Sequence, residues 1–437
     1  MFEKICIILL INILFFSKSL CYKYSSDDIP VFRFPPKNMP TIWHKIFYWV
    51  EGSYRAGPQV DHALTMLIHG IISVFIYVGF GANNVSFIAA ILFMLNPVNN
   101  QASVWISGRS YALANLGMTG ALAMPFLSPI LLIVATYYNA GFLVPVLFLT
   151  LNPWLTLAAV PGWAINFKRF KTNVTHKINK EMFVEDKQIK FEKLVIAIKT
   201  FGYYTTLALF PFKITFYHAF LQSCAGSGKD KAYTVNDRFF WIGLALIASM
   251  ITYLVIMPWS MVSFGIVWWC VCLAPFCNLF RMSQEIAERY TYLPLTGLMF
   301  VLASLLVNYP FVLMFVIGAY AMRLWQYADC YQDDYFLIET ACLNSPDAWF
   351  AWHIRAMSRW ERQSYQEAVI LWTMARMLSP KEFKLNFNIA TALRLSKNEK
   401  EAIHFIKQAE ANIPRGQEEE IKKLLEDWYA GKLSIIL

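Results

Sequence analysis

The sequence predicts an all-α protein: a polytopic membrane helix bundle of about 11 spans, followed by a C-terminal domain of tetratricopeptide-like helical repeats. Composition supports the membrane part. Hydrophobic residues make up 57% of the 437 residues and charged residues 15%, whereas roughly a quarter of the residues in soluble domains are charged. Apolar runs recur up to residue 325, and prolines recur regularly beyond it. We therefore expect two domains, over residues 1–325 and 326–437.

Eleven apolar segments are candidates for membrane spans, although several are shorter than the roughly 20 residues that a perpendicular helix needs. They cover residues 4–20, 61–80, 85–96, 110–126, 127–139, 141–165, 194–211, 238–257, 261–280, 290–307 and 309–325. The first could instead be a cleaved signal peptide. We prefer a span, and the segment 21–60 lies outside with either choice.

The loop 166–193 sets the orientation, because short loops rich in lysine and arginine stay on the cytoplasmic side. Its bases are Lys168, Arg169, Lys171, Lys177, Lys180, Lys187, Lys190 and Lys193. Counting spans from this loop places the N-terminus in the cytoplasm. The segments 21–60, 97–109 and 281–289 and the repeat domain then share the non-cytoplasmic face. The membrane is either a bacterial inner membrane or the endoplasmic reticulum membrane.

Beyond residue 326 the pattern is helical and charged, and Pro346, Pro380 and Pro414 recur at intervals of 34 residues. This is the period of tetratricopeptide repeats. Small residues recur at the same offset, as in Ala356 and Ala390, where paired helices must approach closely. Because a stack needs about three units or a cap, we expect support from the membrane domain or from a terminal helix over 416–430. The array is either a surface for a protein partner or acceptor, or a structural cover.

The first outside segment carries an acidic pair, Asp27 and Asp28, and later the run Ser53-Tyr54-Arg55. Adjacent carboxylates repel each other, so one of them is a candidate for a raised pKa and for the role of a base. The alternative is a solvated turn in which an aspartate caps a helix.

The second outside segment, residues 96–110, is rich in amides and includes Asn99, Asn100 and Arg109. Amides and a single guanidinium suit a polyhydroxylated ligand. A short re-entrant helix capped by asparagine is the alternative.

The third outside segment lies between two long apolar runs and contains Glu285, Glu288 and Arg289. Charges this close to hydrocarbon are costly, which indicates a functional site at the membrane surface. Arg289 could bind an anionic phosphate, or it could pair with Glu285 four residues before it.

Other chemistries find little support. The chain has no glycine-rich nucleotide loop after a strand, no Gly-x-Ser-x-Gly and no His-Glu-x-x-His. The eight cysteines lack the spacing of a zinc site or a disulfide framework. The net charge of +9 comes from loops and the C-terminal domain, so we expect no nucleic-acid partner.

Taken in order, the motifs resemble those of the multispanning C-superfamily (GT-C) glycosyltransferases, in particular the transmembrane and tetratricopeptide-repeat-containing O-mannosyltransferases. The most specific stretch is Glu288-Arg289-Tyr290 with Tyr292-Leu293-Pro294. The other matching stretches are Ser26-Asp27-Asp28, Ser53-Tyr54-Arg55, His69 to Tyr77, Asn96-Pro97 to Arg109, Tyr203 to Tyr217 and Asn278 to Pro294. The resemblance covers nearly the whole chain.

The resemblance implies a sugar donor linked to a polyprenyl phosphate and catalysis on the non-cytoplasmic face. The base expected in the first outside loop maps to Asp27 or Asp28. Arg289, Arg109 and Arg55 are candidates for binding the donor phosphate. The residues expected to support the site are Glu285, Glu288, Tyr54, Asn99 and Asn100. A divalent metal is optional in that superfamily, and no carboxylate cluster in this sequence requires one.

We therefore expect a hexosyltransferase, with mannose as the suggested sugar, that glycosylates a serine or threonine of a protein. One alternative keeps the fold and transfers the sugar to a surface glycan or lipid. Another is a non-catalytic membrane scaffold that recruits partners through its repeats.

Overall fold

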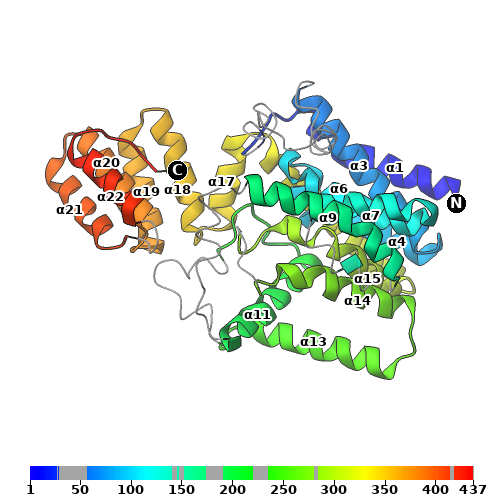
Figure 1. Cartoon of the computed structure of the whole chain (residues 1–437). Helices are drawn as coiled ribbons and strands as arrows, with labels where there is room; N and C mark the ends of the chain where they lie inside the picture. Colours follow the sequence, from blue (N-terminus) through cyan, green and yellow to red (C-terminus); the bar gives the residue numbers. More distant parts are fainter. Residues whose placement is uncertain are drawn as a thin grey trace.

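A computed structural model describes residues 1–26, 28, 57–139, 145–146, 152–173, 190–219, 235–279, 284–413 and 418–436, without the side chains of 167–173 and 190. These residues form helices and contain no strand (Figure 1). The predicted all-α class is therefore confirmed for the described part of the chain.

The N-terminal part is a bundle of packed helices. Its main helices are α1 (Phe2–Phe16), α3 (Pro58–Gly79), α4 (Asn84–Leu95), α6 (Arg109–Ala123), α7 (Ser128–Tyr138), α9 (Pro153–Asn173), α11 (Lys190–Leu209), α13 (Arg238–Ile256), α14 (Met261–Leu273), α15 (Pro294–Leu306) and α16 (Pro310–Ala328). Helix α3 packs against α1, α4 and α6, while α15 packs against α4 and α14. The apolar core is continuous through these helices.

Four described helices are long and apolar enough to cross a membrane: Phe2–Cys21, Pro58–Gly79, Arg238–Ile256 and Pro310–Tyr331. The count of about 11 spans is therefore not supported. Several predicted spans correspond to short helices, such as the 12 residues of α4, which cover only about 18 Å of a core about 30 Å thick. Proline follows the end of α4 closely at Pro97 and stands near the start of α7 at Pro125. Hydropathy alone does not locate these ends.

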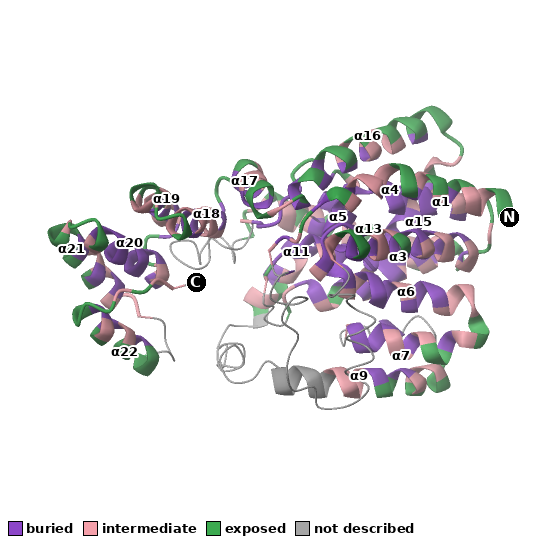
Figure 2. Cartoon of the chain, turned by 90° about the horizontal axis from the view of Figure 1, so that it is seen from above, coloured by how far each residue is buried: buried purple, intermediate pink, exposed green. Residues whose placement is uncertain are grey.

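Helix α16 exposes large apolar side chains along one side (Figure 2). Phe311 and Phe315 are 82% and 77% exposed, and Val255 on α13 is 79% exposed. Extended apolar faces of this kind are rare on soluble monomers and are compatible with contact to lipid.

Helices α11 and α13 cross closely at two glycines. A Cβ atom on Gly202 would lie 2.2 Å from the carbonyl oxygen of Phe239, and one on Gly243 would lie 2.1 Å from that of Ile198. Small residues allow backbones to approach in this way, as is common between membrane helices.

The C-terminal part consists of the helices α17 (Asp334–Asn344), α18 (Trp349–Glu361), α19 (Tyr365–Leu378), α20 (Phe383–Leu395), α21 (Glu399–Glu410) and α22 (Glu418–Tyr429). Of these, α17 packs on the bundle, while α19, α20, α21 and α22 lie to one side of it in Figure 1. Helix α18 packs on α19, and α20 packs on α19 and α21. The predicted domain boundary at residue 325 falls inside α16, which ends at Ala328.

Buried positions in these pairs follow the interval of 34 residues. The equivalent pairs Ala356 and Ala390, Ala368 and Ala402, Trp372 and Ile406, and Ala375 and Ala409 are all fully buried. The terminal helix α22 also contributes to this core, through Ile421, Leu425 and Trp428. Helix α17, two hairpins and the terminal helix α22 thus occupy the predicted region, and the assignment of the hairpins as tetratricopeptide repeats remains a prediction.

Candidate functional site

Polar segments from three parts of the sequence meet at one end of the bundle. The first follows η1 (Ser17–Cys21), the second joins η3 (Pro97–Asn99), α5 (Asn100–Ser103) and η4 (Ile106–Gly108), and the third contains η9 (Glu288–Thr291). Trp105 in the second segment contacts both others: its indole N–H donates to the Ser25 carbonyl, and its ring lies against Arg289. The segments predicted to share one face therefore lie close together.

Asp28 is a buried carboxylate held by two serines. Its Oδ2 accepts a hydrogen bond from the Ser25 N–H at 3.0 Å. Its Oδ1 accepts from the N–H and the hydroxyl of Ser107 at 2.8 and 2.6 Å. Burial raises the pKa of Asp28 to about 7, against the opposing effect of these hydrogen bonds. The cause is loss of hydration, whereas the sequence suggested repulsion by Asp27, which lies outside the described residues.

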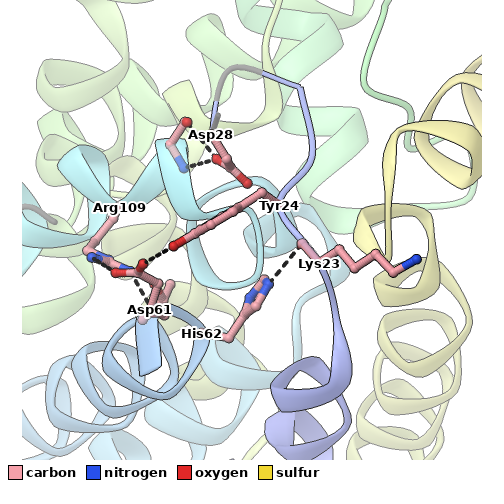
Figure 3. A network of polar contacts seen from close by, with 8 residues as sticks. Lys23, Tyr24, Asp28, Asp61, His62 and Arg109 are labelled. Atoms are coloured by element: carbon pink, nitrogen blue, oxygen red, sulfur yellow. Dashed lines mark hydrogen bonds and ion pairs between the residues drawn. The ribbon is translucent and has the colours of Figure 1, made fainter. Parts of the chain in front are cut away.

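Arg109 forms a buried ion pair with Asp61 of α3 (Figure 3). Its Nη2 lies 3.2 Å from Asp61 Oδ1 and 2.6 Å from the Asp61 carbonyl, and its Nε donates to Thr65 Oγ1 at 2.9 Å. Both charged side chains are fully buried. The guanidinium predicted to bind phosphate thus faces a carboxylate inside the bundle.

The segment that carries Asp28 is anchored from both sides. The Tyr24 hydroxyl donates to Asp61 Oδ2 at 2.8 Å, and His62 Nε2 lies 3.3 Å from the Lys23 carbonyl (Figure 3). On the other side, the Tyr22 hydroxyl donates to Asp329 at 2.6 Å, close to the end of α16. These contacts fix the position of the backbone leading to Asp28.

Arg289 lies among aromatic rings. Its guanidinium carbon is 5.5 Å from the ring centre of Trp105, 5.7 Å from Tyr111 and 5.2 Å from Tyr290. None of the ion pairs found in the described part of the chain includes Arg289. Its buried Nη1 has no hydrogen-bond partner there. Arg289 is thus a partly buried cation stabilised by rings, and an anion can still bind to it.

Glu288 contacts the segment that follows α11. Its Oε1 accepts from the Thr215 N–H at 2.5 Å and lies 3.3 Å from His218 Nε2. Burial raises the pKa of Glu288, and the contacts with His218 and Thr215 oppose this effect. Glu285 is exposed, and its carbonyl accepts from Asn278 at 2.7 Å.

The predicted supporting amides are fully buried. Asn99 Nδ2 donates to the carbonyl of Phe93 at the end of α4, and Asn100 Nδ2 donates to that of Leu324 in α16 at 3.4 Å. Their neighbour Gln101 accepts from the Arg289 N–H at 2.8 Å. These amides connect helix ends within the bundle. Tyr54 and Arg55 lie outside the described residues.

Several residues at the site were missed from the sequence: Asp61, Ser107, Gln101, Trp105 and His218. Asp61 carried a usable signal, since a carboxylate at the start of an apolar helix is costly without a partner. The other four residues carry no such signal in the sequence, because their roles depend on contacts with residues far away along the chain.

Within the described ranges, no group of three His, Cys, Asp or Glu side chains is placed to hold a metal ion. Comparisons of the chain with models of known protein families, with curated proteins and with solved structures found no match.

Proposed function

We propose that the chain is a membrane glycosyltransferase that moves a hexose from a polyprenyl phosphate to a hydroxyl of a protein acceptor. The observation that carries this proposal is the pairing of a buried carboxylate, Asp28, with a cation that lacks an ionic partner among the described residues, Arg289. Trp105 contacts both segments. Transfer from a lipid phosphate requires a base and an anion site, and Trp105 connects the two candidates for these roles.

Asp28 is the proposed base. A serine or threonine hydroxyl is a weak nucleophile, so a carboxylate must accept its proton as the sugar C1 acquires oxocarbenium character. A pKa of about 7 suits this role, because the carboxylate is then partly ionised at neutral pH and basic enough to take the proton. Asp27, next in the chain, remains the alternative base.

Arg289 is the proposed ligand of the donor phosphate. The leaving group is a phosphate anion, and a guanidinium can donate two parallel hydrogen bonds to it. The rings of Trp105, Tyr111 and Tyr290 hold the cation without neutralising it. Its Nη1, which has no hydrogen-bond partner within the described ranges, provides one donor.

Arg109 receives a positioning role in this proposal. Its contacts with Asp61 and Thr65 tie the start of α6 to α3. Ser107, whose N–H and hydroxyl donate to Asp28, lies just before the start of α6. Arg109 therefore positions the backbone that holds the base, and Arg289 alone is the proposed ligand of the phosphate.

The apolar helices favour a membrane location, and a lipid-linked donor would reach the site from the bilayer. The paired C-terminal helices would offer the protein acceptor a docking surface. We also propose that the site lies on the non-cytoplasmic face, a placement that depends on the expected cytoplasmic position of the basic loop 166–193.

The test is transfer of radiolabelled hexose from polyprenyl phosphate to peptides and to extracted glycans by purified protein. We expect Asp28→Asn to reduce peptide glycosylation at least 100-fold. Asp333→Asn serves as the matched control, because Asp333 caps α17 and asparagine caps equally well. Asp27→Asn and the double variant complete the set. Full transfer by all three variants would remove the catalytic assignment, and labelling of glycans alone would identify a different acceptor.

A further inference from the structure

The chain reverses direction after α22. Gly431 has a φ of +83°, a left-handed conformation that favours glycine. Its N–H donates to the Trp428 carbonyl at 3.0 Å, and the Lys432 N–H donates to the Asp427 carbonyl at 2.9 Å. This pair of bonds is a Schellman motif, which ends a helix and redirects the backbone. The residues that follow return to α20, as the red terminal trace in Figure 1 shows.

One side chain of α20 binds both backbone groups of a single tail residue. Asn388 Nδ2 donates to the Ile436 carbonyl at 2.9 Å, and Asn388 Oδ1 accepts from the Ile436 N–H at 2.8 Å. Two residues earlier, the Ser434 carbonyl accepts from Thr391 Oγ1 at 3.4 Å. All these contacts are made to the tail backbone, so they do not depend on the tail's side chains.

Most of the tail's apolar side chains pack on the C-terminal helices. Leu433, Ile435 and Ile436 are partly buried and pack against their apolar cluster, whereas Ser434 is exposed. The tail therefore contributes both backbone hydrogen bonds and aliphatic side chains.

Asn388 is otherwise an unfavourable choice for this position. It is fully buried in the middle of a helix, where asparagine has low helix propensity and its amide needs a partner. The hydrogen bonds it makes with described residues both go to Ile436. A leucine or alanine would suit a helix packed only against other helices.

We propose that the face of α20 around Asn388 and Thr391 is a binding site for short peptides rich in aliphatic residues. The chain's own residues 432–436 occupy this site and exclude a second peptide. The inference concerns peptide binding alone and stands independently of the proposed sugar transfer.

The experiment uses the full chain in lipid nanodiscs, a variant ending at Gly431, and a fluorescent peptide with the sequence of residues 432–437. Fluorescence anisotropy measures binding. The tethered tail competes at an effective concentration in the millimolar range. We therefore expect the peptide to bind the shortened variant at least tenfold more tightly than the intact chain.

Two further changes test the role of the asparagine. In the shortened variant, Asn388→Ala should weaken binding at least tenfold, whereas Asn398→Ala, at the start of α21, should leave it unchanged. A peptide methylated on the amide nitrogen that corresponds to Ile436 should bind as weakly. If the peptide binds the shortened variant equally tightly with and without Asn388→Ala, the proposal is overturned.

If truncation unfolds the C-terminal helices, as circular dichroism would reveal, the intact chain with Ile435→Asp replaces the shortened one. This change loosens the tail and keeps the helices, so the peptide should then bind. Absence of saturable binding to a folded variant with a removed or loosened tail would also overturn the proposal.

Discussion

The indole N–H of Trp105 donates to the Ser25 carbonyl at 3.2 Å, while the same ring lies 5.5 Å from the guanidinium carbon of Arg289. Ser25 in turn donates its N–H to Asp28. Trp105 is 4% exposed, so this arrangement is part of the packed interior. One ring therefore contacts both the segment that holds the proposed base and the proposed phosphate ligand.

Replacing Trp105 with phenylalanine tests this relationship. The smaller ring still packs against Arg289 but cannot donate to Ser25. We expect kcat to fall about tenfold, because one neutral hydrogen bond is lost, with little change in the donor KM. Steady-state kinetics with lipid-linked hexose measure both, and Trp259→Phe, at a residue 69% exposed, is the control. A higher donor KM at unchanged kcat would mean that Trp105 acts only through Arg289.

Arg289 should determine the affinity for the donor phosphate. Arg289→Gln removes the charge, and we expect the donor KM to rise about 100-fold; Arg289→Lys keeps the charge without the planar fork and should be intermediate. Arg362→Gln, at an exposed arginine after α18, controls for loss of positive charge. Equal donor KM values for the glutamine variant and the parent would exclude Arg289 as the phosphate ligand.

The pH dependence of transfer should follow Asp28. Because its pKa is raised to about 7, the basic form increases as pH rises through neutrality, and kcat should increase in parallel. Ser107 hydrogen bonds lower this pKa, so Ser107→Ala should move the midpoint to higher pH. A profile that is flat between pH 6 and about 8 in the parent would contradict this assignment.

The same shift has a consequence for stability. The folded pKa of about 7 exceeds the ordinary value of 3.8, so the folded state binds more protons between these values. Stability contributed by Asp28 is therefore full at low pH and is lost as pH rises from about 4 to 7. Thermal unfolding of Asp28→Asn should lack this loss. A parent and variant with parallel stability curves would show that Asp28 keeps an ordinary pKa.

Sequence patterns located helices better than their ends or their partners. Each described predicted span contains a helix, because apolar runs and prolines are local signals. The pair of Asp61 and Arg109 was not predicted, since it joins residues 48 positions apart. The composition of a segment does not predict which carboxylate will form an ion pair with a given arginine.

The amides illustrate the same limit. Asn99 and Asn100 looked suitable for a sugar, yet their side chains donate to carbonyls of neighbouring helices. The amides of such a segment can form hydrogen bonds either with a ligand or with helix carbonyls. Which of these they form depends on how α4 and α16 pack around them. Asp28, by contrast, was a candidate because it adjoins Asp27, and Arg289 because a charge beside an apolar run is costly; their roles remain predictions.

The buried ion pair makes a further prediction. Asp61→Asn leaves the charge of Arg109 buried without its carboxylate, and we expect a loss of about 3–5 kcal/mol in the free energy of unfolding. Adding Arg109→Met removes that charge, so the double variant should regain much of the stability. Thermal unfolding in detergent measures this, and Asp333→Asn, at the cap of α17, is the control. If the single and double variants are equally stable, the buried charge of Arg109 is not the cause of the loss, and the two side chains contribute only through packing.

The glycine crossing of α11 and α13 predicts a large effect from a single methyl group. Gly243→Ala places a Cβ 2.1 Å from the Ile198 carbonyl oxygen, and backbone atoms must move apart to accept it. We expect a loss of about 1–3 kcal/mol in the free energy of unfolding. Gly318→Ala in α16 is the matched control, because nothing lies within 4 Å of its added Cβ, and alanine is the better helix former by about 1 kcal/mol. The two variants should therefore shift the melting temperature in opposite directions. If Gly243→Ala melts at or above the temperature of the parent, the two helices do not cross as closely as described.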